Sequence, residues 1–459
     1  SLGGDLVRLE LLKHRDPERR DHNLVLLGPE HRYALQSGLT TEGAPNHKTL
    51  FTPAQTEYTL APGADTVDVK LEATGPTGIK VVKTYRFNRN SYLINLTEEV
   101  INGTGAPLAT TAYFHLTRDN RPPPGDQAMM PTYNGPAVYT EASKYQKMSW
   151  SDVDKNKPPY PTTTQTDGWV AVIQHYFVAA LLPAPKTNRE FYTEKISDGF
   201  YRAGFKSPLA PIEPGATGSI SVPVYLGPQE QSTLEHLAPG LPLVVDYGIF
   251  KIFAEPLFWL LKFCYQLTHN WGWAIVLLTI AVKLAFFPLQ AASYRAMAKM
   301  KEVTPRLTKL REQFGDDRLK LNQAMMDLYK KEKINPAAGC LPVLVQIPVF
   351  IALYWVLLGA VELRQAPWIG WIHDLSLADP LYVLPILMLI SMLIQTKMNP
   401  TPPDPVQAKV MMIMPFVFGV MFFWFPAGLV LYWFVNNLFS IAQQWYISRK
   451  YKAEHPAKA

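Results

Sequence analysis

Hydrophobic and polar positions follow different patterns in the two halves of the chain. Residues 1–240 contain short alternating or β-branched stretches that are separated by clusters of Pro, Gly and Asn. Such stretches predict strands, and a sandwich of more than about ten strands fits a region of this length. We therefore expect an all-β soluble domain over residues 1–240. The clearest predicted strands are 66–71, 80–87, 92–101, 169–182 and 218–226.

The second half contains long apolar runs that predict membrane-spanning helices. The first run is 271–289, and the others are 341–361, 381–395, 410–425 and 428–441. The runs 381–395 and 410–425 are shorter than the roughly 20 residues that a span normally needs. Either the bilayer is thinned around them or the true helices extend into their flanks.

A different pattern joins the two halves. Residues 241–270 alternate aromatic and charged positions with helical spacing, and Pro256 interrupts them. The pattern predicts an amphipathic helix, broken near Pro256, that lies in the membrane interface. It would connect the β domain to the membrane.

Charge is distributed unevenly between the halves. Residues 1–240 hold 23 Lys+Arg and 25 Asp+Glu, whereas the rest of the chain holds 21 and 13. Segment 291–340 alone carries 11 basic and 6 acidic residues, so the positive-inside rule places it in the cytoplasm. The β domain then lies outside the cytoplasm and the C-terminus inside. Because export needs a targeting segment, we expect a signal anchor or signal peptide to precede the β domain.

The cytoplasmic segment has its own periodic pattern. Apolar residues with helical spacing stop at Gly315 and resume at Leu321, which predicts a helical hairpin within 291–340. Methionines recur along the apolar face of these helices. They suit either an adaptable surface that binds apolar clients or the packing between the two helices. The methionines concerned are Met297, Met300, Met325 and Met326.

The most informative polar position is Lys283, inside the run 271–289. An ionisable residue within a membrane costs at least about 2.5 kcal/mol and indicates function by default. The alternative is snorkelling, because Lys283 precedes Leu289 by only roughly 9 Å of helix. Thr279 lies one turn earlier on the same face, which favours a polar lining. Gln346 is an amide within its own run and needs a partner or water.

Other chemistry is sparse. Cys264 and Cys340 flank different apolar runs, so they say little about redox compartment. The histidines of the first half show no metal-ligand spacing. The adjacent Glu98 and Glu99 would point to opposite faces of a strand. None of these residues forms a catalytic constellation.

Several strings in the second half resemble a known family. Together they span about residues 245–450, in order and at the family's spacing. They are 331–336 (KEKINP), 346–350 (QIPVF), 362–367 (ELRQAP), 371–376 (WIHDLS) and 424–432 (WFPAGLVLY). The region resembles the YidC/Oxa/Alb family of bacterial membrane protein insertases, and the large β domain resembles that of the Gram-negative form.

The resemblance implies a fold and an activity. The fold would be a periplasmic β-supersandwich, an interfacial helix over 241–270, a core of five transmembrane helices over 271–450 and a cytoplasmic tail over 451–459. The protein would be an insertase rather than an enzyme, and it would need no cofactor or nucleotide. It would reside in the bacterial inner membrane. Its partners would be nascent membrane proteins, the Sec translocon, membrane lipids and, weakly, the ribosome, with no direct recognition of nucleic acid.

The resemblance also implies a hydrophilic groove, open to cytoplasm and lipid but closed on the outer side, that receives client tails. Lys283 stands where the family has an arginine. The positive charge is therefore kept, but the planar guanidinium group with its five hydrogen-bond donors is lost. Trp433 stands where a tyrosine is common. By matching position, the groove residues would be Lys283, Thr279, Gln346, Tyr432, Trp433 and Asn436, with the hairpin methionines capturing clients.

Two other classes of function stay open at this stage. A transporter or channel would also place polar residues in its spans, although the sequence has no evident inverted repeat. An enzyme acting on envelope carbohydrate would use the β domain.

Overall fold

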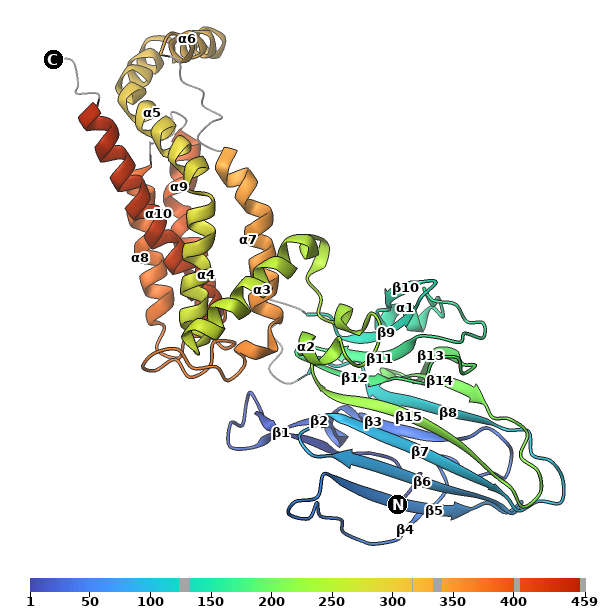
Figure 1. Ribbon diagram of the computed structural model, residues 1–459. Helices are drawn as coiled ribbons and strands as arrows, with labels where there is room; N and C mark the ends of the chain where they lie inside the picture. Colours follow the sequence, from blue (N-terminus) through green and yellow to red (C-terminus); the bar gives the residue numbers. More distant parts are fainter. Residues whose placement is uncertain (124–131, 316, 333–340, 400–404, 455–459) are drawn as a thin grey trace. The chain divides into compact units, whose positions relative to one another are not determined.

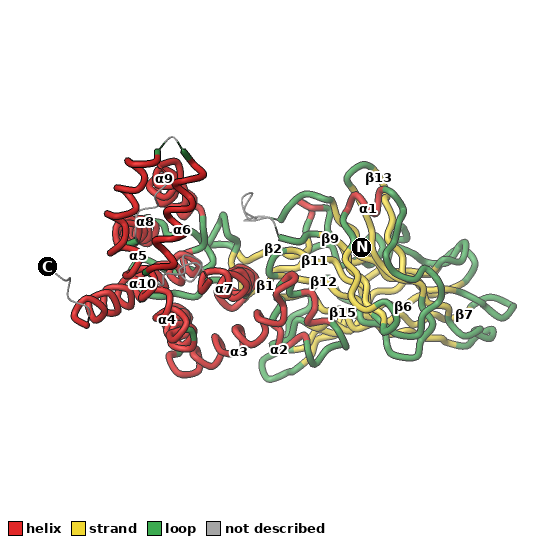
Figure 2. Tube along the Cα trace, turned by 90° about the horizontal axis from the view of Figure 1, so that it is seen from above, coloured by secondary structure: helices red, strands yellow, loops and turns green. Residues whose placement is uncertain are grey.

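The computed structural model describes residues 1–123, 132–315, 317–332, 341–399 and 405–454. The chain divides into two compact units, Ser1–Asp246 and Tyr247–Ala459. Strands build the first unit and helices the second (Figures 1 and 2). This arrangement of an all-β domain followed by a helical region confirms the fold class predicted from the sequence. Cys340 and the last residues of the predicted tail, 455–459, lie outside the described residues.

The β unit contains three sheets with antiparallel pairing. The largest sheet is built from β4 (Thr52–Pro53), β5 (Thr66–Thr74), β6 (Ile79–Asn88), β7 (Leu93–Asn102), β9 (Gly135–Thr140), β10 (Lys144–Lys147), β11 (Trp169–Gln174), β12 (Phe177–Leu181) and β15 (Thr217–Pro228), in the order β10-β9-β11-β12-β15-β7-β6-β5-β4. A second sheet has the order β13-β14-β8-β3 and consists of β3 (Ala34–Leu39), β8 (Thr111–Asp119), β13 (Glu190–Ser197) and β14 (Phe200–Pro208). The third pairs β1 (Leu9–Arg15) with β2 (Asn23–Leu27), and two short helices, α1 (Trp150–Asp154) and α2 (Gln231–Leu234), complete the unit.

Alternation of side chains explains how two of these sheets share one core. Along β6, Ile79, Val81, Lys83 and Tyr85 are buried, while the residues that alternate with them are half-exposed. The four-stranded sheet contributes every second residue to the same apolar cluster, including Leu35 and Phe114. Burying one face of each sheet in this way removes apolar surface from water, which is the main stabilising term.

One predicted strand is wrong in its extent. The stretch 169–182 is two strands, β11 and β12, joined by a turn at His175 and Tyr176. Tyr176 adopts a left-handed conformation, with φ of 67°. Such a turn normally contains glycine or asparagine. Neither residue is present here, so the apolar sequence pattern shows no break between the two strands.

The β unit also buries an ion pair in its interior. Lys83 on β6 and Glu98 on β7 are both fully buried, with Nζ 3.4 Å from Oε1. Lys83 Nζ donates to Gly3 O at 2.8 Å, to Ser37 O at 2.8 Å and to Ser37 Oγ at 2.9 Å. Ser37 Oγ in turn donates to Glu98 Oε1 at 2.5 Å. Glu98 therefore points inward, and Glu99 is exposed on the opposite face, as strand alternation predicts.

The helical unit contains α3 (Lys251–Thr268), α4 (Trp271–Ala285), α5 (Phe287–Phe314), α6 (Arg318–Lys331), α7 (Leu341–Gly359), α8 (Val383–Met398), α9 (Pro405–Met421) and α10 (Ala427–Glu454). Helix α3 continues through Pro256, so the predicted break at this residue is wrong. Pro256 removes one hydrogen-bond donor, but the helix ends only at His269, whose φ is 51°. The chain bends before α3 instead, between the short 3₁₀ turns Leu241–Val244 and Gly248–Phe250.

The first apolar run also differs from its predicted extent. Helix α4 ends at Ala285 and α5 begins at Phe287, with Pro288 in its first turn. The two helices meet at an angle of 68°. Leu289 therefore belongs to α5, because the proline starts a new helix more readily than it continues one.

The helices differ in whether their length and composition suit a membrane span. None of the described helices taken singly is long and apolar enough, whereas α4 and α5 together satisfy the criterion across their bend. Shorter apolar helices cover Val345–Gly359, Val383–Met398 and Ala408–Trp424.

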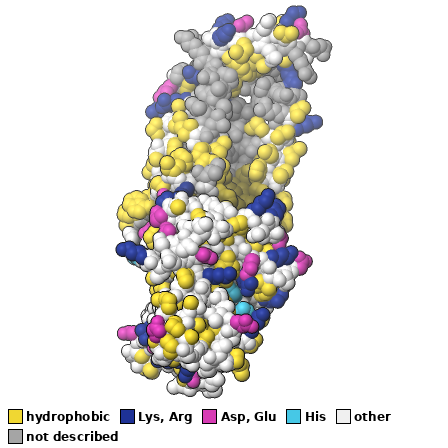
Figure 3. Space-filling view, turned by 90° about the vertical axis from the view of Figure 1, so that its right-hand side faces the viewer, with side chains coloured by type: hydrophobic (Ala, Val, Ile, Leu, Met, Phe, Trp, Pro, Cys, Tyr) yellow, Lys and Arg dark blue, Asp and Glu magenta, His cyan; other side chains and the backbone are white. Residues whose placement is uncertain are grey.

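Large apolar side chains are exposed on the outer surface of the helical unit. Ile386, Ile390 and Ile394 on α8 are each about half-exposed, and Phe416 and Val417 on α9 are more so. On the face shown in Figure 3, hydrophobic side chains lie along both sides of this unit, and charged ones gather toward the end that carries α5 and α6. Apolar surface of this extent is typical of a protein that meets lipid or a partner.

The buried ion pair of the β unit leads to a stability prediction. Replacing Lys83 with Met leaves the Glu98 carboxylate buried without a cation, and we expect a loss of about 3–5 kcal/mol in the free energy of unfolding. The double substitution Lys83→Met with Glu98→Gln removes the charge and keeps an acceptor for Ser37, so it should recover most of that loss. Calorimetric unfolding of the two variants beside the parent chain measures both values. A double variant no more stable than Lys83→Met would contradict the account.

Candidate functional site

A polar cavity of about 370 Å³ lies inside the helical unit. Side chains from α4, α5, α7, α8 and α10 line it, so helices far apart in sequence build it together. Among the residues that the structure describes, its lining combines one lysine with amides, hydroxyls and a few apolar groups, and it contains no Asp or Glu. The lining residues are Lys283, Gln290, Ser293, Tyr294, Met297, Gln346, Ile347, Phe350, Gln395, Asn399, Asn436 and Ser440.

Lys283 is the only basic residue among the described residues of this lining, and only 3% of its surface is exposed. Its ammonium group donates to Ser440 Oγ on α10, at 2.7 Å. Ser440 Oγ donates onward to the backbone oxygen of Asn436, at 2.8 Å. Within the described part of the chain, Lys283 forms no ion pair. The site is therefore a buried positive charge with hydrogen-bonding capacity to spare, because an ammonium group has three donors.

Amide side chains form a large part of the rest of the lining. Gln290 Nε2 on α5 donates to Gln346 Oε1 on α7, at 3.3 Å. The other polar atom of Gln290, Oε1, is buried and has no hydrogen-bond partner among the described residues. Gln395 and Asn399 extend the lining at the end of α8. Such groups can exchange hydrogen bonds with water or with a polar chain that enters.

Of the groove residues predicted from the sequence, Lys283, Gln346 and Asn436 line this cavity together, and Met297 joins them. Thr279 does not. It is buried, and its hydroxyl donates to Ile275 O of its own helix at 2.7 Å. This local bond uses the hydroxyl within α4, as is common for threonine in helices.

Tyr432 and Trp433 are buried beside the cavity rather than in its lining. The Trp433 ring stacks on Phe350 of α7 with centroids 5.2 Å apart, and Phe350 itself lines the cavity. Trp433 also contacts Phe422 at 4.5 Å and Phe425 at 5.6 Å between centroids. The result is an apolar layer of aromatic rings at one end of the polar space.

The hairpin methionines are distributed between two environments. Met297 is at the cavity, and Met300 is half-buried on α5. On α6, Met325 is half-buried and Met326 is 54% exposed. Asp317 caps the start of α6 by accepting from Lys320 N, and Arg306 pairs with Glu332 at 2.6 Å. These contacts hold the two helices as a hairpin with an exposed apolar surface on α6.

Several lining residues were not predicted. Ser440 follows Asn436 by one helical turn, and Gln444 follows Ser440 by another, so a polar stripe along α10 was available as a signal. Gln444 is buried and donates to Asn399 Oδ1 at 3.0 Å. Gln290 and Ser293 follow the bend at Phe286, and nothing in the sequence pattern places them beside Lys283.

The described residues of this cavity do not include a set of metal ligands. Among the residues that the structure describes, no group of three or more His, Cys, Asp and Glu side chains is arranged to hold a metal ion. The cysteine of α3, Cys264, is buried and is not part of the cavity.

Comparisons with known proteins cover nearly the whole chain. Residues 1–260 match the family model described as YidC periplasmic domain, and residues 263–454 match the one described as 60Kd inner membrane protein. The membrane protein insertase YidC of Dechloromonas aromatica is 55% identical over 100% of this chain and 84% of its own length. That of Aromatoleum aromaticum is 52% identical over 98% of this chain and 82% of its own length.

A solved structure was also similar. The crystal structure of an active YidC insertase with its first transmembrane domain resolved aligns over 89% of this chain and 83% of that chain, at 18% identity and a TM-score of 0.42. The assignment rests on the two family models and on the sequence relatives. The chain therefore belongs to the YidC family of membrane protein insertases, with a YidC periplasmic domain followed by the 60Kd inner membrane protein domain.

Proposed function

We propose that this chain inserts membrane proteins by drawing a hydrophilic segment of the client into the cavity around Lys283. The observation that carries this proposal is a buried ammonium group in a polar cavity whose described lining residues include no carboxylate. At an effective dielectric constant of about 20, an opposite charge about 4 Å away gains about 4 kcal/mol. A client tail that carries an acidic residue would supply this missing charge.

The neutral lining supports the same use. A polar segment that leaves water loses hydrogen bonds, and each unsatisfied group costs roughly 1–3 kcal/mol. Gln346, Gln395 and Asn436, on three different helices, provide replacement donors and acceptors in the cavity. The segment would thus be held loosely, without a fixed sequence requirement.

The aromatic layer gives the cavity a direction. Trp433 lies near the start of α10, and Asn436 and Ser440 follow toward its C-terminal end. Because the basic segment 291–340 favours a cytoplasmic location for the hairpin and the C-terminus, the aromatic layer would close the outer side. The polar part would then open toward the cytoplasm, and the client's apolar helix would leave toward lipid.

The surrounding helices suit a membrane environment. We propose that α4 with the start of α5, together with α7, α8, α9 and α10, form five spans whose exposed apolar side chains face lipid. Helix α3 exposes Ile252, Trp259 and Leu267 to more than 60% each, and it would lie in the interface on the outer side. Cooperation with the Sec translocon and a weak contact with the ribosome belong to this proposal through family membership.

One prediction of the proposed function concerns the charge at position 283. We expect Lys283→Arg to insert clients normally, because the cation is retained. Lys283→Met should lower the insertion of clients with acidic tails by about tenfold, which corresponds to roughly 1.4 kcal/mol, and should affect neutral tails little. Protease protection of client tails in proteoliposomes measures insertion.

Lys397→Met, which removes an exposed lysine outside the cavity lining, is the matched control. Equal insertion of acidic and neutral tails by Lys283→Met would falsify the proposed attraction.

A second prediction concerns client capture by the hairpin. Replacing Met325 and Met326 with Gln makes the surface of α6 polar, so crosslinking of a nascent client to this helix should fall several-fold. Replacing both with Leu keeps the apolar surface and should preserve most of the crosslinking. The same loss in the Gln and Leu variants would show that α6 does not capture clients through its apolar surface.

A further inference from the structure

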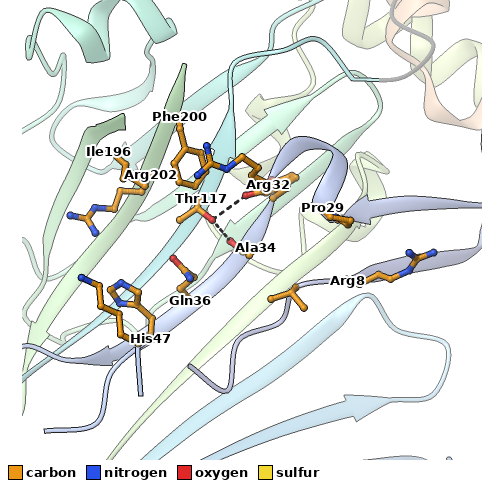
Figure 4. Close-up of a pocket in the computed structure, with 14 residues that line it drawn as sticks. Arg8, Pro29, Arg32, Ala34, Gln36, His47, Thr117, Ile196, Phe200 and Arg202 are labelled. Carbon is orange, nitrogen blue, oxygen red and sulfur yellow. Dashed lines mark hydrogen bonds between the residues drawn. The ribbon is translucent and has the colours of Figure 1, made fainter. Parts of the chain in front are cut away.

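A second cavity, of about 730 Å³, lies in the β unit on the face of the four-stranded sheet that does not contribute to the core. Alternation sorts the residues of this sheet. Leu35 and Phe114 point into the core, whereas Gln36, Thr117 and Arg202 lie on the opposite face and line the cavity (Figure 4). The sheet thus forms the floor of a groove, and the flanking segments form its walls.

The walls of this groove are basic. Arg8, Arg32, Lys48 and Arg202 line the groove, and no Asp or Glu among the residues that the structure describes does. Arg8 pairs with Glu10 and Arg202 with Glu194, both outside the lining. Within the described residues, neither Arg32 nor Lys48 forms an ion pair. The groove therefore keeps positive charge, although residues 1–240 have a slight excess of acidic groups.

Arg32 is held in a defined position. It adopts a left-handed conformation, with φ of 50°, just after the short 3₁₀ turn Pro29–His31. Its guanidinium group lies over the Phe200 ring, with Cζ 3.9 Å from the ring centroid. Stacking on an aromatic ring orients the planar group and leaves its edge donors free for a carboxylate.

The floor is a fixed polar network. His115, which is 1% exposed, hydrogen-bonds to Tyr192 Oη through Nδ1 at 2.8 Å and to Gln36 Oε1 through Nε2 at 3.2 Å. Gln36 Nε2 donates to Asp5 Oδ2 at 2.7 Å. Burial, reinforced by nearby cations, lowers the pKa of His115 to about 3, so this ring stays neutral. Burial also raises the pKa of Asp5 to about 6. The floor therefore adds little negative charge below that value.

His47, at the edge of the groove, is also influenced by the nearby positive charges. Its Nδ1 is hydrogen-bonded to Tyr113 Oη. Partial burial lowers the pKa of His47, and the charges of Lys48, Arg202 and Lys83 lower it further. An anion bound in the groove would oppose these charges.

We propose that this groove binds an acidic peptide segment of a partner protein. Its carboxylates would pair with Arg32 and Lys48, and an apolar side chain would pack on Phe200 and Ile196. A neutral saccharide fits less well. Thr117 Oγ1 is already directed to backbone oxygens of Arg32 and Ala34, and Gln36 is engaged in the floor (Figure 4). Charge complementarity thus favours an anionic ligand over a neutral one.

The test uses the full chain in detergent and a fluorescent peptide of alternating Glu and Val residues. Fluorescence anisotropy should show saturable binding that weakens with salt. Arg32→Gln and Lys48→Gln should each weaken binding by about tenfold, since each removes an unpaired cation. Lys70→Gln removes an exposed lysine on β5, which does not line the groove, and should leave binding unchanged.

Further arms separate the possible ligands. A peptide of alternating Lys and Val should not bind, and bound acidic peptide should raise the pKa of His47 in an NMR titration. The proposal is overturned if the acidic peptide fails to bind or if Arg32→Gln and Lys48→Gln bind it as tightly as the parent chain. It is also overturned if phosphate or glucuronate saturates the groove while the peptide does not bind.

Discussion

The helical unit is organised around one electrostatic constraint, the burial of a lysine that has no carboxylate beside it among the described residues. Taking an ammonium group out of water costs several kcal/mol unless hydrogen bonds and opposite charge compensate. Ser440 provides one hydrogen bond to Lys283, and amides from α5, α7 and α8 provide a polar surrounding. The helices must therefore keep a polar space between them, and close apolar packing is displaced to the aromatic layer around Trp433.

The same chain buries a second lysine in a contrasting way. Lys83 in the β unit uses its donors on Gly3 and Ser37 and has Glu98 at 3.4 Å. Its charge is compensated within the fold, so it can serve stability but has little capacity left for a ligand. Lys283 lacks such compensation in the described residues. Comparing the two shows why burial of a charge alone does not indicate function, whereas burial without a counter-ion does.

Local patterns predicted much of this structure, and long-range packing accounts for what they missed. Alternation identified the strands around Val81 and Leu96, and it predicted that Glu98 and Glu99 point to opposite faces, although not which of them is buried. It failed at Tyr176, because this residue adopts a left-handed turn conformation without being glycine or asparagine. In the helical unit, Lys283 and Gln346 stand out because polar residues are rare in apolar runs. Gln290 lies in a polar segment where it is unremarkable, and only the bend at Phe286 brings it to the cavity. Thr279 shares a helical face with Lys283, yet its hydroxyl is bound to its own helix.

Net charge was the least informative quantity for the β unit. Residues 1–240 carry slightly more acidic than basic groups, yet the described lining of one groove contains four basic residues and no acidic one. The field that a ligand meets depends on nearby charges, because salt screens distant ones over about 8 Å. Arg32 reaches the groove only through a left-handed turn, and Arg202 only through the register of β14 with β8. A domain that is nearly neutral overall can therefore select anions at one place, and only the three-dimensional structure identifies that place.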